Sequence, residues 1–277
     1  MNHRSMSQYP LVTVVTATRN RKQLLERLIQ SVIAQTYKNV EHVVVDGLSN
    51  DGTQELLARY EKKYRLRWIS EKDRNQVEAI NKGLRMAQGE YVTVTHDDDY
   101  WLPEGIAVLM KEAVRVPDAD IIYGDSWGEY ADGNRVRRRY RRYTLDDMLN
   151  RGYQIPQDGS IFRRSWLPNV GYLDERIEYV PEYELFLRIM RSHGTVRHIP
   201  EVTSVGGLHE EKKSWVGAKR SWDETWTVNR KHGGRFFSPF TLLFVKNRYL
   251  RGFAGAVKMK FPKLFQYAKR RARTPEY

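Results

Sequence analysis

The first half of the chain alternates short apolar runs with amphipathic segments. The runs have the length and β-branched composition of buried strands, and they span residues 11–17, 40–45, 66–69, 91–95 and 119–123. Between them, apolar residues recur at helical spacing over 24–33, 53–60 and 77–87, and Pro103 opens a further helix. Strands that alternate with helices predict an α/β fold, with a mostly parallel sheet that carries helices on both faces.

Acidic residues follow three of the predicted strands. Asp46 ends the second strand, Asp73 lies shortly after the third, and Asp97-Asp98-Asp99 follows the fourth. In a parallel sheet, ligands collect beyond the carboxyl ends of the strands. The sequence therefore predicts a binding site at this edge of the sheet, built around carboxylates.

The three adjacent aspartates indicate a bound cation. Neighbouring carboxylates repel one another, so three of them at a strand end are costly unless a cation or solvent relieves the charge. Mn²⁺ or Mg²⁺ prefers oxygen ligands and is commonly held by one or two carboxylates together with substrate phosphates. On the residues alone, a solvated acidic turn that caps the next helix is an equal alternative. The position at the end of an apolar strand favours the metal.

Five segments in a fixed order carry a family resemblance. They read VTVVTATRNR at 12–21, VVDGLSNDGT at 44–53, SEKDRNQVEAINKG at 70–83, AQGEYV at 87–92 and HDDDYWLP at 96–103. The series resembles glycosyltransferase family 2, which has the GT-A (Rossmann-like) fold and inverting chemistry on nucleotide-sugar donors. The resemblance implies a GT-A domain at 10–215, with a nucleotide-sugar half at about 10–125 and an acceptor half at about 126–215. Residues 216–277 would form a helical, basic and amphipathic C-terminal extension.

The resemblance assigns residues to the donor side of the site. Thr16, Arg19 and Asp46 would contact the nucleotide base and ribose, with Asp46 accepting hydrogen bonds. Asp73 would help to close the nucleotide pocket, and Asn81 is a further donor-side candidate. Each residue alone has an ordinary structural explanation, as a strand, surface, turn, loop or capping residue. Only the occurrence of all of them in the family's order favours a functional explanation.

The same resemblance places the aspartate cluster at the family's DxD-type site. Asp98 is the first choice as ligand of Mn²⁺ or Mg²⁺, with Asp99 or Asp97 supporting it, and Asp97 also faces the nucleotide sugar. His209 would be a further metal ligand, although a lone loop histidine is as often structural. Leu48 stands where the family often has glycine, which leaves the shape of the donor pocket, and hence the sugar, open.

The second half supplies the acceptor side and the base. Gln157 and Ser160 are the polar candidates in a segment that resembles the family's acceptor cleft. An inverting transfer needs one base for the acceptor hydroxyl proton, and a metal or cationic group for the departing diphosphate. Glu182 stands where the family usually has its catalytic aspartate, and Glu184 is the alternative. Without the resemblance, Glu182 is a first-turn carboxylate favoured by the helix dipole.

The net charge of +13 is concentrated in two places. Six arginines lie between 135 and 142, and ten lysines and arginines between 246 and 273, so the remainder is slightly acidic. Aromatic and aliphatic residues interleave with the second group, a composition typical of an interfacial helix on anionic lipid. The alternative is a helix packed on the domain with a solvated basic face.

The sequence predicts a cytoplasmic protein, free or peripheral on the inner face of the cell membrane. It has no cysteine, no apolar leader in the first ten residues and no apolar stretch near the roughly 20 residues that span a bilayer. The leading hypothesis is a hexosyl- or N-acetylhexosaminyl-type transfer from a nucleotide-diphosphate sugar to a glycan or lipid-linked saccharide, in bacterial surface polysaccharide synthesis.

Two other classes of protein compete with a transferase. A nucleic-acid-binding protein would use the basic tail, but we expect no nucleic acid partner because the acidic strand ends would repel phosphate. A nucleotidyltransferase on a similar sheet would need a glycine-rich phosphate loop, which the N-terminal part lacks.

Overall fold

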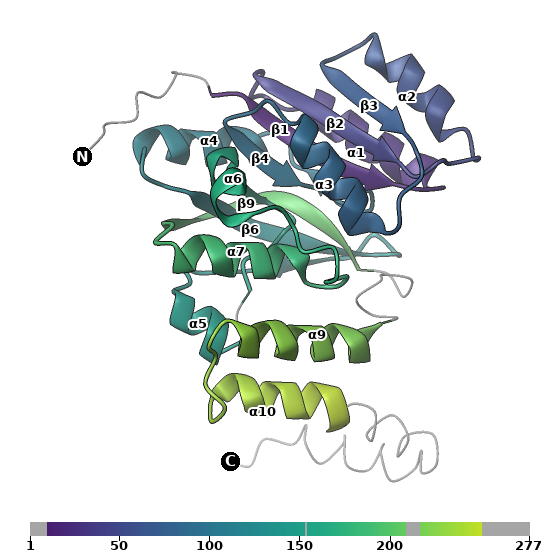
Figure 1. The fold of residues 1–277 in the computed structure, drawn as a ribbon. Helices are drawn as coiled ribbons and strands as arrows, with labels where there is room; N and C mark the ends of the chain where they lie inside the picture. The colour runs from purple at the N-terminus through teal and green to yellow at the C-terminus, as the bar shows by residue number, and fades with distance from the viewer. Residues whose placement is uncertain (1–9, 153, 209–216, 251–277) are drawn as a thin grey trace, which may run out of the picture.

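The computed structural model describes residues 10–152, 154–208 and 217–250. Within these ranges, nine strands form one sheet (Figure 1). Its first half is parallel, in the order β3 (Leu66–Ser70), β2 (Val40–Asp46), β1 (Val12–Thr18) and β4 (Tyr91–Val94). All four strands were predicted, and their parallel pairing confirms the α/β prediction.

Helices cover both faces of the parallel half, because alternate strand residues point to opposite sides. On one face, Val15 and Ala17 of β1 pack in the same core as α3 (Gln76–Met86). On the other face, Val14 packs with α1 (Lys22–Ile33) and α4 (Gly105–Arg115). The fourth helix, α2 (Thr53–Glu61), packs against α1 and β2.

The second half continues the sheet with mixed pairing. The strand β8 (Ser160–Arg163) runs antiparallel between β4 and β6 (Ile121–Tyr130). The long β9 (Val196–Leu208) pairs with β6 in parallel and with the short β5 (Tyr100–Trp101) antiparallel. The strands β6 and β7 (Arg135–Arg138) form a hairpin, and Gly133 in its turn has a φ of 82°.

The arginine block on and after β7 is mostly paired with carboxylates of the same chain. Arg135 contacts Glu129, Arg137 contacts Asp125, Arg138 contacts Asp158 and Arg141 contacts Asp147. These pairs neutralise four of the six arginines in the block. The block therefore serves chiefly to hold β7 and the loop after it on the domain.

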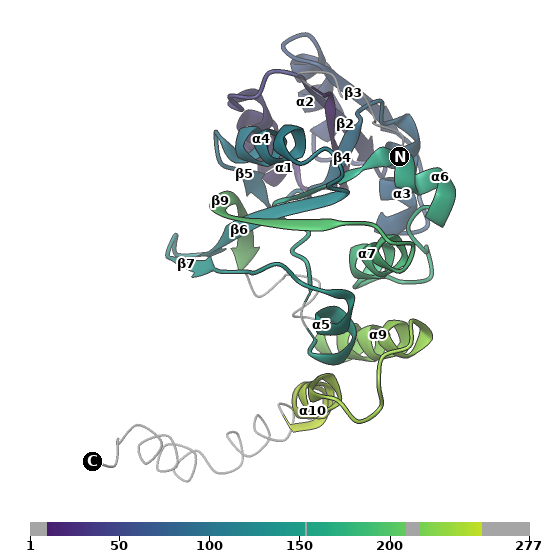
Figure 2. The ribbon, with the colours of Figure 1, turned by 90° about the vertical axis from the view of Figure 1, so that its left-hand side faces the viewer.

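Helices complete the C-terminal half. A short helical segment (η1, Arg164–Trp166) and α6 (Leu167–Val170) precede α7 (Pro181–Arg191), which packs on the sheet. Figure 2 shows α5 (Leu145–Asn150), α9 (Ala218–Lys231) and α10 (Pro239–Val245) on the side of α7 away from the sheet. A π-helical turn at Lys246–Leu250 follows α10.

The helices α9 and α10 lie in the C-terminal part that was expected to be helical. Residues 251–277, with most of the predicted basic tail, lie outside the described residues. Among the helices that the structure describes, none is both long and apolar enough to cross a bilayer.

Candidate active site

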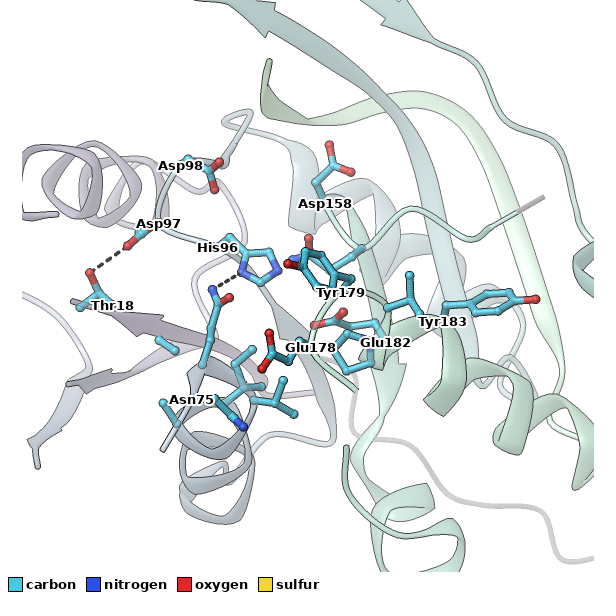
Figure 3. A pocket seen from close by; sticks show the side chains of 18 of the residues that line it. Thr18, Asn75, His96, Asp97, Asp98, Asp158, Glu178, Tyr179, Glu182 and Tyr183 are labelled. Carbon is cyan, nitrogen blue, oxygen red and sulfur yellow. Dashed lines mark hydrogen bonds between the residues drawn. The ribbon is translucent and has the colours of Figure 1, made fainter. Parts of the chain in front are cut away.

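A cavity of about 760 Å³ opens at the carboxyl ends of β1 and β4, between α3 and α7. The segments that follow these strands form one side, and the segment that enters α7 forms the other (Figure 3). The polar residues that line it include Thr18, Arg19, Arg21, Asp73, Gln76, His96, Asp97, Asp98, Gln157, Asp158, Glu178 and Glu182. The cavity thus lies at the sheet edge that the acidic strand ends predict.

Asp97 is held at the floor of this cavity. Its carboxylate accepts a hydrogen bond from the Thr18 hydroxyl at 2.9 Å and pairs with the Arg21 guanidinium at 3.1 Å. Burial raises the pKa of Asp97, an effect that Arg21 and Thr18 only partly oppose. The ionised carboxylate is therefore costly to the folded protein, as expected of a site built to hold a positive charge.

Asp98 and Asp99 lie on different sides of the loop. Asp98 lines the cavity, and its backbone carbonyl accepts a hydrogen bond from Arg27 at 3.0 Å. Asp99 is turned towards β9, where its carboxylate accepts the Gly207 amide at 3.1 Å, and it is not among the described lining residues. Asp99 precedes β5, which pairs with β9, and its predicted role as a metal ligand remains a prediction. His209 lies outside the described residues.

A divalent cation fits the donor set of the cavity. Asp97 and Asp98 line it from consecutive positions and offer hard oxygen ligands. Among the residues that the structure describes, no three His, Cys, Asp or Glu side chains group closely enough to form a cage made by protein alone. Two carboxylates suit a Mg²⁺ or Mn²⁺ whose remaining ligands are substrate phosphates and water.

Arg19 and Asp73 form the predicted nucleotide end of the cavity. Both line it, and they converge on Gly47, where a Cβ atom would lie 2.6 Å from an Asp73 carboxylate oxygen and 3.3 Å from Cδ of Arg19. Only glycine leaves room for this approach. Burial raises the pKa of Asp73, with Lys82 and Arg19 opposing it.

Thr16 and Asp46 stand behind the cavity wall and are not among the described residues that line it. Thr16 points to the opposite face of β1 from Ala17, and its hydroxyl donates to the Thr95 carbonyl at 2.9 Å. Asp46 is fully buried and accepts hydrogen bonds from Ser49 and from the Ser70 hydroxyl at 2.6 Å. Both side chains support the loops that form the cavity. The predicted direct contacts of Thr16 and Asp46 with base and ribose remain predictions.

Asp46 also fixes an unusual turn. Leu48 follows it with a φ of 57°, the left-handed region that favours glycine, and its side chain is exposed. Glycine adopts this conformation most readily, which fits the glycine that the family often has where this chain has Leu48. The strained residue beside Gly47 is retained because Asp46 accepts the Ser49 amide at 3.1 Å and closes the turn.

Asn81 is buried in a structural contact. Its amide donates to the Leu173 carbonyl at 2.9 Å and accepts the Leu173 amide at 3.0 Å. It thus ties α3 to the segment before α7 and is not among the described lining residues, which differs from its predicted place.

The acceptor candidates divide in the same way. Gln157 lines the cavity, and its amide donates to the Val94 carbonyl at the end of β4. Ser160 is buried behind it, where its hydroxyl donates to the Gln157 carbonyl at 3.3 Å. Ser160 therefore supports Gln157 rather than facing the cavity.

The structure distinguishes the two candidate bases. Glu182, in the first turn of α7, lines the cavity, and its Oε1 is buried with no hydrogen-bond partner among the described residues. Glu184 points away from the cavity to Arg188 at 2.7 Å and His232 at 3.0 Å. Although burial raises the pKa of Glu184, the His232 and Arg188 hydrogen bonds outweigh it and lower the pKa to about 2. Of the two candidate bases, Glu182 is therefore the one that faces the cavity.

Several lining residues were not singled out by sequence reasoning. Thr18 and Arg21 hold Asp97, and Gln76 hydrogen-bonds to His96 at 2.9 Å in the centre of the cavity (Figure 3). Thr18, Arg21 and His96 fall inside the quoted motifs, so their signal was present. Asp158 pairs with Arg138 at 3.1 Å. Its place in the cavity results from a contact between separate segments, which a local sequence pattern does not predict.

The helix α9 contacts the segment that leads into α7 and Glu182. The Glu224 carboxylate accepts the backbone amides of Glu178 at 3.0 Å and Tyr179 at 2.7 Å, just before Pro181 opens α7. Such charge-assisted bonds are stronger than neutral ones. The extension is therefore part of the support of the site.

Comparison with solved structures defines the class of fold. The chain resembles the mannosyltransferase PcManGT from Pyrobaculum calidifontis, solved with GDP-Man and Mn²⁺, with a TM-score of 0.65 and 19% identity over 96% of this chain and 81% of that one. It also resembles S. aureus TarS 1-349 solved with UDP-GlcNAc, with a TM-score of 0.68 and 16% identity over 92% and 78% of the two chains. The fold is therefore that of the GT-A glycosyltransferases.

Sequence comparison gives the family. The family model of glycosyl transferase family 2 matches residues 13–171, more than half of the chain. A relative in Escherichia coli (strain K12), described as "Putative colanic acid biosynthesis glycosyl transferase WcaA", is 24% identical over 88% of this chain and 91% of its own. This chain belongs to glycosyltransferase family 2, and the resemblance drawn from its motifs is confirmed.

Asp97→Asn should raise the stability of the ligand-free protein. Because the pKa of Asp97 is raised above its ordinary value of 3.8, the folded protein loses stability relative to the unfolded chain as pH rises from 3.8 towards the raised pKa, and this loss is not regained at higher pH. Asparagine keeps the shape without the charge, so we expect the melting temperature at pH 7 to rise by about 2 °C or more. The gain should vanish near pH 3. An Asp97→Asn variant that melts lower than wild type at pH 7, while exposed Asp118→Asn is unchanged, contradicts this electrostatic account.

Glu224→Ala should lower turnover without weakening donor binding. Loss of both amide contacts frees the segment before α7, so we expect kcat to fall about tenfold and the donor KM to stay within about twofold. The matched control is Asp223→Ala, which removes only an ion pair with Arg248. Equal kinetics for the two variants would show that Glu224 has no positioning role.

Proposed function

We propose that this glycosyltransferase transfers one sugar, with inversion, from a nucleoside-diphosphate donor to a hydroxyl of a glycan or lipid-linked saccharide. The observation that carries the proposal is the presence of Asp97, Asp98 and Glu182 in one cavity, from two independent elements of the fold. Asp97 and Asp98 suit a cation that would stabilise the leaving diphosphate, and Glu182 suits the proton of the attacking hydroxyl.

The similar proteins support the substrate classes. The two solved neighbours were obtained with GDP-Man and with UDP-GlcNAc, so we propose a hexosyl or N-acetylhexosaminyl donor. The E. coli relative is described as a colanic acid biosynthesis enzyme, which supports a role in bacterial surface polysaccharide synthesis.

The donor would lie across the β1 and β4 ends of the cavity. Arg19 and Asp73 flank the nucleotide end, and Arg21 adds a positive charge beside Asp97. Asp98, supported by Asp97, would hold Mn²⁺ or Mg²⁺ there. When bound, this cation would neutralise the negative charge that develops on the departing diphosphate.

Glu182 would act as the general base. Its carboxylate takes the proton of the acceptor hydroxyl as that oxygen attacks the anomeric carbon from the side opposite the diphosphate. The bond between the anomeric carbon and the phosphate oxygen breaks, the diphosphate leaves with the bonding electrons, and the configuration inverts. Oε1 of Glu182 is buried and has no hydrogen-bond donor among the described residues. The hydroxyl of the acceptor substrate could donate that hydrogen bond, which supports this role. Gln157 would line the acceptor side.

Glu182→Gln should lower turnover by roughly 100-fold or more, because the amide cannot accept the proton. Nucleotide binding, measured by thermal shift with a nucleoside diphosphate and Mn²⁺, should be unchanged. Glu178→Gln is the matched control, since Glu178 is a second carboxylate that lines the cavity. Full turnover by Glu182→Gln, with loss in Glu178→Gln, would transfer the role of base to Glu178.

A further inference from the structure

The helix α10 is apolar on both of its sides. Phe240 and Phe244 face inward and stack on the Trp226 ring of α9, with ring centroids 6.0 and 4.4 Å apart. On the outer side, Leu242 is 74% exposed and Val245 is 43% exposed. A surface helix normally has one apolar face against the protein and one polar face towards water. A helix with a second apolar face therefore indicates a second apolar environment on its outer side.

The exposed apolar residues continue on either side of α10. In the loop from α9, Phe236 is 60% exposed and Phe237 is 92% exposed, and Tyr249 is exposed in the turn that follows α10. We call these five residues, Phe236, Phe237, Leu242, Val245 and Tyr249, the α10 surface. Half of the ten exposed large hydrophobic residues in the described part of the chain lie in this stretch of 14 residues. Such a concentration marks an interaction site.

Positive charge accompanies the α10 surface. Lys246 is exposed on the turn after Val245, and the exposed Arg235 beside Phe236 is paired with Asp146 at 2.9 Å. The sequence beyond Leu250 then contains eight lysines and arginines against one glutamate. A second copy of the chain on this surface would bring two such sets of like charge together, whereas an anionic lipid surface would be attracted by them.

We propose that the α10 surface docks on an anionic bilayer, with Phe236 and Phe237 entering the boundary between headgroups and acyl chains. Exposed aromatic and aliphatic residues beside cations are the combination that binds such an interface. The positive charges and the apolar residues of the α10 surface act together, because neither electrostatic attraction nor one pair of apolar side chains gives stable attachment alone. This inference goes beyond the transfer reaction and does not depend on it.

The test is cosedimentation of the full chain with vesicles. Wild type should bind vesicles of phosphatidylcholine and phosphatidylglycerol and bind phosphatidylcholine alone weakly. The Phe236→Ser/Phe237→Ser variant should need at least about tenfold more anionic lipid for half-binding, because it loses two inserted rings. Val114→Ser/Val136→Ser, which removes two exposed apolar residues elsewhere, should bind as wild type.

Stability and oligomeric state without lipid, and donor binding, are measured as controls. In the absence of lipid, the Phe236→Ser/Phe237→Ser variant should melt within about 2 °C of wild type and keep the same oligomeric state. Phe237 is almost fully exposed, and Phe236 is mostly exposed and makes an edge contact with the Trp226 ring. Wild-type vesicle binding by this variant overturns the proposal. So does a clear loss of stability, or dissociation of an oligomer, without lipid, since either would mean that the chain itself or a second copy covers the surface. Donor binding, measured by thermal shift, should be equal in all three proteins, which keeps this test separate from that of the transferase site.

Discussion

The burial of two neighbouring carboxylates at the end of β4 is the constraint on which the site depends. Asp97 and Asp98 are both nearly inaccessible to solvent, and the Arg21 guanidinium and Thr18 hydroxyl at Asp97 leave its pKa raised. The parallel strands β1 and β4 place these groups together, because both strands end at the same edge of the sheet. Arg21 and Thr18 offset part of the cost of the buried charge, and the proposed cation would offset more of it.

The other half of the site is built from the C-terminal part of the chain. Glu182 faces the cavity because Pro181 opens α7 there, while Glu184 anchors the same helix to His232 at the end of α9. Glu224 of α9 then holds the backbone just before α7. The C-terminal extension thus helps to position Glu182, the proposed base. The outer side of α10 remains exposed on the same helical layer (Figure 2).

The strand–helix alternation and the ordered motifs were sufficient to predict the α/β fold, the position of the site and the cavity residues Arg19, Asp73, Asp97, Asp98, Gln157 and Glu182. Side-chain direction was less predictable. Thr16 lies one residue from Ala17, and strand alternation turns it to the far face of β1. Asp99 is drawn to Gly207 by a pairing of β5 with β9 that joins segments about a hundred residues apart. Asp46 ends β2 and Asn81 lies in α3, both near the cavity, yet their polar atoms are satisfied by Ser49 and Leu173 within the protein.

The most direct test of the central claim is a titration of UDP and GDP into the protein with and without Mn²⁺. If Asp98 holds a cation that grips the diphosphate, one of the two nucleotides binds at least about tenfold more tightly with Mn²⁺. Asp98→Asn should abolish that difference, whereas Asp99→Asn should preserve it because its carboxylate faces Gly207. Binding of equal strength without a divalent cation, and in Asp98→Asn, would contradict the account.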